Sequence, residues 1–389
     1  MSEIDSVIQK AKELLANSNP EDALQLLSQY GQDESYINDV KYLNILGETL
    51  LENSEVEEAF KIYSRSIELD PNGQVSVDGF FNLGQIVGGF DGLQYIIKGC
   101  TITETQLQER PAQDRPHWLK KIVQGLFAQI EIWMTDLCME PQAETQCQDL
   151  IAKAIELDPS NPETWTLLAS IRISQQQPQE AQEHIRKSWE LFQVKKQGLE
   201  DSADTAASDN NNNNDNNDGD VNLEYIEMIQ PLLTLAKYAT EVGLFDVAAT
   251  VAANIHDITD DLLEPFYVEA FSNYLAAKTL EYQLKNPNAV DEGDGSRLEA
   301  INNVKLSMDS EGNGATEEIT EYINSALVAL SNGSRIMYAS SDSEDELREQ
   351  IGFLVEELGG KAALKRVEKL NKNEGATINE DNWEDEIQE

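Results

Sequence analysis

The sequence has few cysteines, little positive charge and no long apolar run. Its 3 cysteines, Cys100, Cys138 and Cys147, form no CxxC pair, which argues against a disulfide framework and fits a reducing cytosol or nucleus. No apolar stretch approaches the ~20 residues needed to cross a bilayer. The start, MSEIDSVIQKAKELL, predicts an acidic amphipathic helix and not a secretory signal. We therefore expect a soluble intracellular protein with no membrane partner.

Motifs that carry chemistry are also missing. The sequence contains no P-loop, no GxSxG and no HExxH motif. The 3 histidines lie in separate repeat units, and a lone histidine on a helix is most often structural or solvated. Cys138 and Cys147 read as small core residues of one hairpin, and a metal site there would need further ligands. We expect no enzyme activity, no cofactor and no metal.

Negative charge, by contrast, is in large excess. The 389 residues include 72 acidic and 28 basic side chains, which gives a net charge of −44. Such a chain repels DNA, RNA and anionic membranes and attracts a basic protein. Solubility alone can explain moderate acidity, and that simpler interpretation stays open. We favour a basic partner and expect no direct binding of nucleic acid.

The sequence also contains an internal repeat. Residues 66–72 read SIELDPN and residues 154–160 read AIELDPS, and each copy lies where a helical hairpin should end. The clearest unit runs from Val40 to Gly73. Its small residues Gly47 and Ala59 let the two helices approach, while apolar residues recur every 3–4 positions along the buried stripe.

Other copies of the repeat are less regular. A second good copy begins at Pro162, and weaker units begin near Val7, Phe80, His117, Leu232 and Pro265. The second half of the unit at Phe80 is glycine-rich, GFDGLQYIIKGCTIT, and loses the repeat register. The pattern is that of the tetratricopeptide repeat, a helical hairpin of ~34 residues. We predict an all-α fold, a tetratricopeptide-repeat superhelix (α-solenoid) with disordered acidic insertions and an acidic tail.

Composition divides the chain into folded and unfolded parts. An Asn/Asp-rich stretch and a later acidic stretch cannot bury enough apolar area to offset the ~1–2 kcal/mol per residue that ordering a backbone costs. In chain order, the predicted parts are N-terminal tetratricopeptide repeats (1–195), a disordered Asn/Asp-rich insertion (196–222), further helical repeats (223–285), an acidic loop (286–316), C-terminal helices that cap the array (317–371) and an acidic tail (372–389).

The concave surface of such an array is the expected binding site. Carboxylates mixed with aromatic faces suit a lysine- and arginine-rich peptide, through charge-assisted hydrogen bonds and cation–π contacts. For any single residue, a solvated helix face or a core position remains an equal alternative. The candidate partner-binding residues are Asn44, Glu48, Glu52, Phe81, Gln85, Glu131, Asp136, Glu163, Glu241, Tyr267 and Phe271.

The chain resembles tetratricopeptide proteins over about residues 1–280. Within them it is similar to the fungal assembly chaperones of the fourth protein of the large ribosomal subunit. This resemblance is carried by the N-terminal helix, the ELDP ends at Glu68 and Glu156, the acidic ending NWEDEIQE and the charge of −44.

The resemblance implies a chaperone for a newly made, strongly basic ribosomal protein of the large subunit. Such a chaperone would hold the client's long internal loop, keep the client soluble, accompany it from the cytoplasm into the nucleus and release it on the pre-ribosome. Nuclear import factors would then be further partners. Two alternatives stay open: an acidic histone chaperone, which differs only in its client, and a tetratricopeptide scaffold, which needs the groove but not the acidity.

Overall fold

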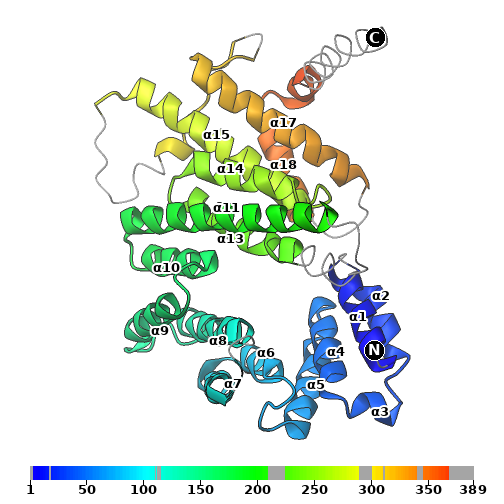
Figure 1. Ribbon diagram of the computed structural model, residues 1–389. Helices are drawn as coiled ribbons and strands as arrows, with labels where there is room; N and C mark the ends of the chain where they lie inside the picture. Colours follow the sequence, from blue (N-terminus) through cyan, green and yellow to red (C-terminus); the bar gives the residue numbers. More distant parts are fainter. Residues whose placement is uncertain are drawn as a thin grey trace. The chain divides into compact units, whose positions relative to one another are not determined.

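Helix is the only regular secondary structure in the described part of this chain (Figure 1). This confirms the predicted all-α, tetratricopeptide-type repeat class. The chain divides into two compact units, Met1–Gln175 and Gln176–Glu389, called unit 1 and unit 2 below. The computed structural model describes residues 3–16, 19–109, 111, 115–208, 224–288, 300–309, 312–339 and 345–367.

Unit 1 is built from helical hairpins. Four pairs of consecutive helices pack as hairpins: α1 with α2, α4 with α5, α6 with α7, and α8 with α9. The first helices of neighbouring hairpins also touch, since α1 contacts α4 and both α6 and α10 contact α8. The helices of this unit are α1 (Glu3–Ala16), α2 (Pro20–Ser28), α3 (Glu34–Ile37), α4 (Val40–Glu52), α5 (Val56–Leu69), α6 (Asp78–Val87), α7 (Gly89–Glu109), α8 (Arg115–Met134), α9 (Ala143–Leu157) and α10 (Pro162–Ser174).

The hairpin of α4 and α5 shows why these residues fold this way. The Asp39 carboxylate accepts a hydrogen bond from the backbone N–H of Tyr42 at 2.8 Å, which caps the start of α4. A methyl group at Gly47 would lie 2.6 Å from the ring of Tyr63 on α5. The expected close approach at Gly47 is therefore confirmed, since only glycine leaves room for this buried tyrosine.

The glycine-rich segment after residue 88 forms one long regular helix, α7, although the repeat pattern is lost in its sequence. A side chain at Gly92 would collide with the backbone carbonyl of Gly84 on α6. A methyl group at Gly99 would lie 2.6 Å from the ring of Phe81. The glycines thus mark a close contact of α6 with α7, and the unit keeps its hairpin.

The two hairpin cysteines have different environments. Cys147 on α9 is buried, as predicted, whereas Cys138 is exposed. The prediction of a core position for Cys138 is wrong because the residue lies in the turn between α8 and α9, where the apolar stripe of the helix has ended.

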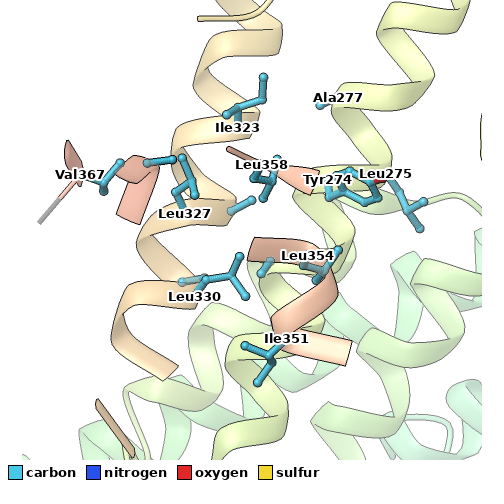
Figure 2. Close-up of a cluster of buried hydrophobic side chains, with 14 of the residues drawn as sticks. Tyr274, Leu275, Ala277, Ile323, Leu327, Leu330, Ile351, Leu354, Leu358 and Val367 are labelled. Atoms are coloured by element: carbon cyan, nitrogen blue, oxygen red, sulfur yellow. The ribbon is translucent and has the colours of Figure 1, made fainter. Parts of the chain in front are cut away.

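Unit 2 is built on longer helices. Helix α11 packs on α13, α13 on α14 and α14 on α15, and α15, α17 and α18 enclose one apolar core (Figure 2). A further helical stretch covers residues 360–367. The helices are α11 (Pro178–Ser208), α13 (Ile229–Glu241), α14 (Phe245–His256), α15 (Leu263–Lys285), α17 (Glu317–Ala339) and α18 (Asp345–Glu357).

The predicted disordered insertion begins too early. Residues 196–208 continue α11, and side chains at the start of this stretch find partners elsewhere in unit 2. Leu199 is buried, and Lys196 forms an ion pair with Asp257 just after α14, with 2.7 Å between Nζ and Oδ2. Residues 209–222 of the predicted insertion lie outside the described residues.

Part of the predicted acidic loop packs along α15. Ile301 is buried, and the ammonium of Lys278 on α15 donates to the carbonyl of Asn302 at 2.5 Å. The hydroxyl of Ser307 donates to the carboxylate of Glu281. Hydrogen bonds therefore attach residues 301–307 to the helix. The remaining stretches at 289–299 and 310–311, and the predicted tail at 372–389, lie outside the described residues.

The contact of α6 with α7 generates a stability prediction. Replacing Gly92 by alanine forces α7 away from the Gly84 carbonyl and should cost about 1–3 kcal/mol, as overpacking typically does. The control is Gly198→Ala, because Gly198 lies in α11 with open space around it and alanine favours a helix interior by about 1 kcal/mol. Urea unfolding followed by circular dichroism should show the two substitutions acting in opposite directions. Equal stability of Gly92→Ala and the parent would contradict this packing.

Candidate partner-binding site

Four helices of unit 1 bring charged side chains to one surface. The charges of Lys12 on α1, Asp78 on α6 and Lys121 on α8 all act on the carboxylate of Glu48 on α4, as does the charge of Glu52 one turn along. Lys121 and Asp78 form an ion pair with 2.6 Å between Nζ and Oδ1. These side chains therefore lie close together, although their positions in the sequence are far apart.

Charged side chains from α1, α6 and α8 surround Glu48 on this surface. Its side chain is exposed, yet desolvation by the surrounding protein raises its pKa. Lys12 and Lys121 lower the pKa, and Asp78 and Glu52 raise it. A carboxylate that water reaches but does not fully hydrate is ready to bind a cation, which would restore the charge balance.

A second contact extends the surface along α6 and α8. The amide of Gln85 donates to the carboxylate of Glu131 at 3.1 Å, and desolvation raises the pKa of Glu131 against the lowering effect of this hydrogen bond. Asp78 and Gln85 are two turns apart on one side of α6, so their contacts with α8 continue the same surface. We call this surface the acidic face of unit 1, defined by Glu48, Glu52, Asp78, Gln85 and Glu131.

Three predicted residues of unit 1 serve the fold itself. The amide oxygen of Asn44 accepts from the hydroxyl of Ser66 at 2.7 Å between α4 and α5, and Phe81 is buried in the core. Asp136 is exposed, and its carboxylate accepts from the backbone N–H of Gly89 at 2.7 Å, where α7 begins. The prediction that Phe81 is accessible to a partner is therefore wrong, because its ring fills the space left by glycines on α7 and α8.

The remaining predicted residues lie elsewhere. Glu163 is half-buried in the first turn of α10. Glu241 is exposed at the end of α13 in unit 2, and Tyr267 and Phe271 stack on α15 with their ring centroids 5.6 Å apart. Sequence reasoning missed Asp78, Lys121 and Lys12, because it considered only a few positions of each first helix, and none of these three residues is among them.

The described residues form no metal site and no membrane-spanning helix, and their two buried thiols are unreactive. Within them no group of three or more His, Cys, Asp or Glu side chains could hold a metal ion. Burial raises the pKa of the Cys100 and Cys147 thiols to about 11, which keeps both protonated and unreactive. None of the described helices has the length and apolar character needed to span a membrane.

Comparisons with protein families match three parts of the chain. Residues 261–382 match the family model described as the ACL4 C-terminal domain. Residues 40–72 and 150–183 match tetratricopeptide-repeat models. The first match corresponds to the predicted unit of Val40–Gly73, and the second overlaps the predicted copy that begins at Pro162 and includes the ELDP phrase before it.

Two curated fungal relatives carry the same description, "Probable assembly chaperone of rpl4". The protein of Schizosaccharomyces pombe is 25% identical over 364 residues, which cover 92% of each chain. The protein of Emericella nidulans is 30% identical over 158 residues, or 39% of each chain. Among solved structures, "Assembly Chaperone of RpL4 (Acl4) (Residues 1-338)" superposes with a TM-score of 0.50 at 22% identity, over 72% of this chain and 99% of that chain. This similarity supports the fold.

The raised pKa of Glu48 predicts how its neutral replacement changes stability with pH. The folded-state pKa lies above the ordinary value of 4.5, so the ionised carboxylate destabilises the folded chain at neutral pH. Glu48→Gln should therefore be more stable than the parent at pH 7, within the ~0.5 kcal/mol typical of surface substitutions. The gain should shrink as the pH falls through the folded pKa and vanish below the unfolded one.

Thermal unfolding between pH 4 and pH 8 would measure this difference. The exposed Glu156 on α9 gives a control substitution, Glu156→Gln, with the same change in net charge. A loss of stability in Glu48→Gln at neutral pH would contradict the desolvation of this carboxylate.

Proposed function

Since the chain belongs to the family of tetratricopeptide-repeat assembly chaperones of Rpl4, we propose that its partner is ribosomal protein L4. The relatives' printed descriptions support this client. The family is one of chaperones and is not enzymatic, in agreement with the expectation from the sequence. The observation that carries the proposal in this chain is the acidic face of unit 1, with its two partly desolvated carboxylates.

An acidic surface suits this work because a ribosomal protein is built to lie on RNA. Before assembly, its basic segments would bind any polyanion or aggregate. The carboxylates of Glu48, Glu52 and Glu131 provide a temporary substitute for phosphates. At cellular salt, charges act over only ~8 Å, so the client must lie directly on the acidic face. Ribosomal RNA carries a denser line of charge and can then displace the chaperone.

We propose further that the bound segment is the client's long internal loop. A flexible basic loop can follow the strip of side chains along α4, α6 and α8, whereas a folded surface would touch it at fewer points. The complex would form in the cytoplasm, enter the nucleus with import factors and deliver L4 to the pre-ribosome. The charge of −44 would keep the complex soluble on the way by balancing a basic client.

Two other functions use the same chemistry. A histone chaperone would need the acidity and differ only in client, and a general scaffold would need the helical surface without the acidity. The relatives described as rpl4 chaperones favour the L4 client. Capture of histones in preference to L4 from a fungal lysate would favour a histone chaperone. Partners that stay bound at high salt would favour a general scaffold.

Neutralising the acidic face tests the proposal. We expect the triple variant Glu48→Gln, Glu52→Gln, Glu131→Gln to bind purified L4 roughly tenfold more weakly, because each exposed ion pair contributes about 0.5 kcal/mol. Isothermal titration calorimetry at several salt concentrations would measure the change. The salt dependence should also become shallower.

A matched triple variant provides the control. Glu21, Glu57 and Glu156 are exposed on the second helices α2, α5 and α9, so their replacement by glutamine removes the same charge from other surfaces. Equal affinities of the two triple variants for L4 would rule out the acidic face as the binding site. Unchanged affinity of the parent at high salt would contradict the electrostatic mechanism.

A further inference from the structure

Unit 2 has an open hollow of about 480 Å³ where α18 passes α15. Aromatic rings and carboxylates line it together: Tyr267 and Phe271 from α15, and Glu346, Glu349 and Phe353 from α18. None of the described residues that line the hollow is basic. The hollow thus combines apolar surface with negative charge.

The aromatic wall on α15 presents flat ring faces. Tyr267 and Phe271 are one turn apart, and their ring planes lie within 9° of parallel. Both rings are partly buried against the core that α15, α17 and α18 share, which fixes their position. A ring pair held in this way offers its negative faces to a cation without further ordering.

The opposite wall on α18 is also held from behind. Leu354 points into the core cluster (Figure 2), and its neighbour Phe353 keeps 61% of its surface exposed. Glu346, Glu349 and Phe353 recur at intervals of three and four residues, so they share one side of the helix. Phe353 therefore adds an exposed ring beside two carboxylates on this wall of the hollow.

We propose that this hollow binds an arginine side chain of the basic client. The guanidinium is planar, so it can stack on an aromatic face while its N–H groups donate to a carboxylate. Lysine has a compact, strongly hydrated ammonium and gains less from the flat rings. The source of the arginine rests on the function proposed above, whereas the hollow itself belongs to unit 2 and shares no residue with the acidic face.

Fluorine NMR of the full chain would detect the binding directly. The chain has 10 phenylalanines, and incorporation of 4-fluorophenylalanine with the substitutions Phe271→Leu and Phe353→Leu assigns the two resonances of interest. Three short glycine-spaced peptides serve as probes: one with two arginines, one with two lysines and one with two citrullines, the neutral analogues of arginine. The chemical shifts of Phe353 and Phe271 should change on addition of the arginine peptide. They should change much less with the lysine peptide and not at all with the citrulline peptide.

Substitutions then link the signal to the hollow. The single variant Phe353→Ala and the double variant with Glu346→Gln and Glu349→Gln should each weaken arginine-peptide binding by roughly threefold to tenfold. Leu284→Ala is the matched apolar control, since Leu284 is 53% exposed on α15, and Glu183→Gln on α11 controls for charge. The assignment would be overturned if the arginine and lysine peptides shifted the two resonances equally. It would also be overturned if the arginine peptide shifted them only in a chain that lacks residues 372–389.

Titration with L4 separates this inference from the proposed function. Loss of affinity in the hollow variants as well as in the acidic-face variant supports both. If only the acidic-face variant loses affinity, the hollow does not serve this client and the inference fails alone. If the parent chain does not bind L4 at all, the proposed function fails, and the peptide experiment still decides whether the hollow recognises arginine.

Discussion

Burial of each helix's apolar stripe against its neighbours is the interaction on which the rest of this structure depends. A single helical hairpin cannot cover its own stripe, so successive hairpins must stack. In unit 1 the packing of α8 on α6 leaves no room for a methyl group at Gly125, which would lie 2.9 Å from the ring of Phe81. In unit 2 the core between α15, α17 and α18 serves the same purpose with longer helices. The acids Glu48, Glu52 and Glu131 remain exposed.

The acidic surface lowers the stability of the free chain and would favour binding of a basic partner. A net charge of −44 repels itself, and desolvation adds to the cost at Glu48 and Glu131. Lys121 relieves part of it by pairing with Asp78. A basic partner would relieve the rest, which links the stability of the folded chain to the affinity for its client.

Much of the fold could be predicted from the sequence, because its signals are local. The ELDP phrases and the small residues at Gly47 and Ala59 identify the hairpin of α4 and α5. The regular helix at α7 could not be predicted in this way, since glycine disfavours a helix unless a neighbour needs the space. Residues 196–208 look polar enough for disorder, yet Lys196 pairs with Asp257 and Leu199 is buried. Local composition does not report such long-range contacts.

The candidate site was predicted less well. Glu48, Glu52, Gln85 and Glu131 lie on one face, whereas Asn44 and Phe81 pack between helices. A repeat pattern gives the approximate side of a helix, whereas the tilt of neighbouring helices decides which residues remain accessible. The ion pair of Asp78 with Lys121 joins residues 43 apart, so only the folded structure reveals it. Tyr267 and Phe271 were expected to contact a basic peptide. The residues that α18 adds to the same hollow could not be predicted, because α18 lies outside the repeat pattern.

Hydrogen–deuterium exchange of the full chain, with and without purified L4, tests the central claim most directly. The account predicts slower exchange on α4, α6 and α8, where a bound client would cover the acidic face. Little change is expected on the second helices α2, α5 and α9 of the same unit. Protection confined to those second helices, or no protection anywhere in unit 1 at saturating L4, would contradict the account.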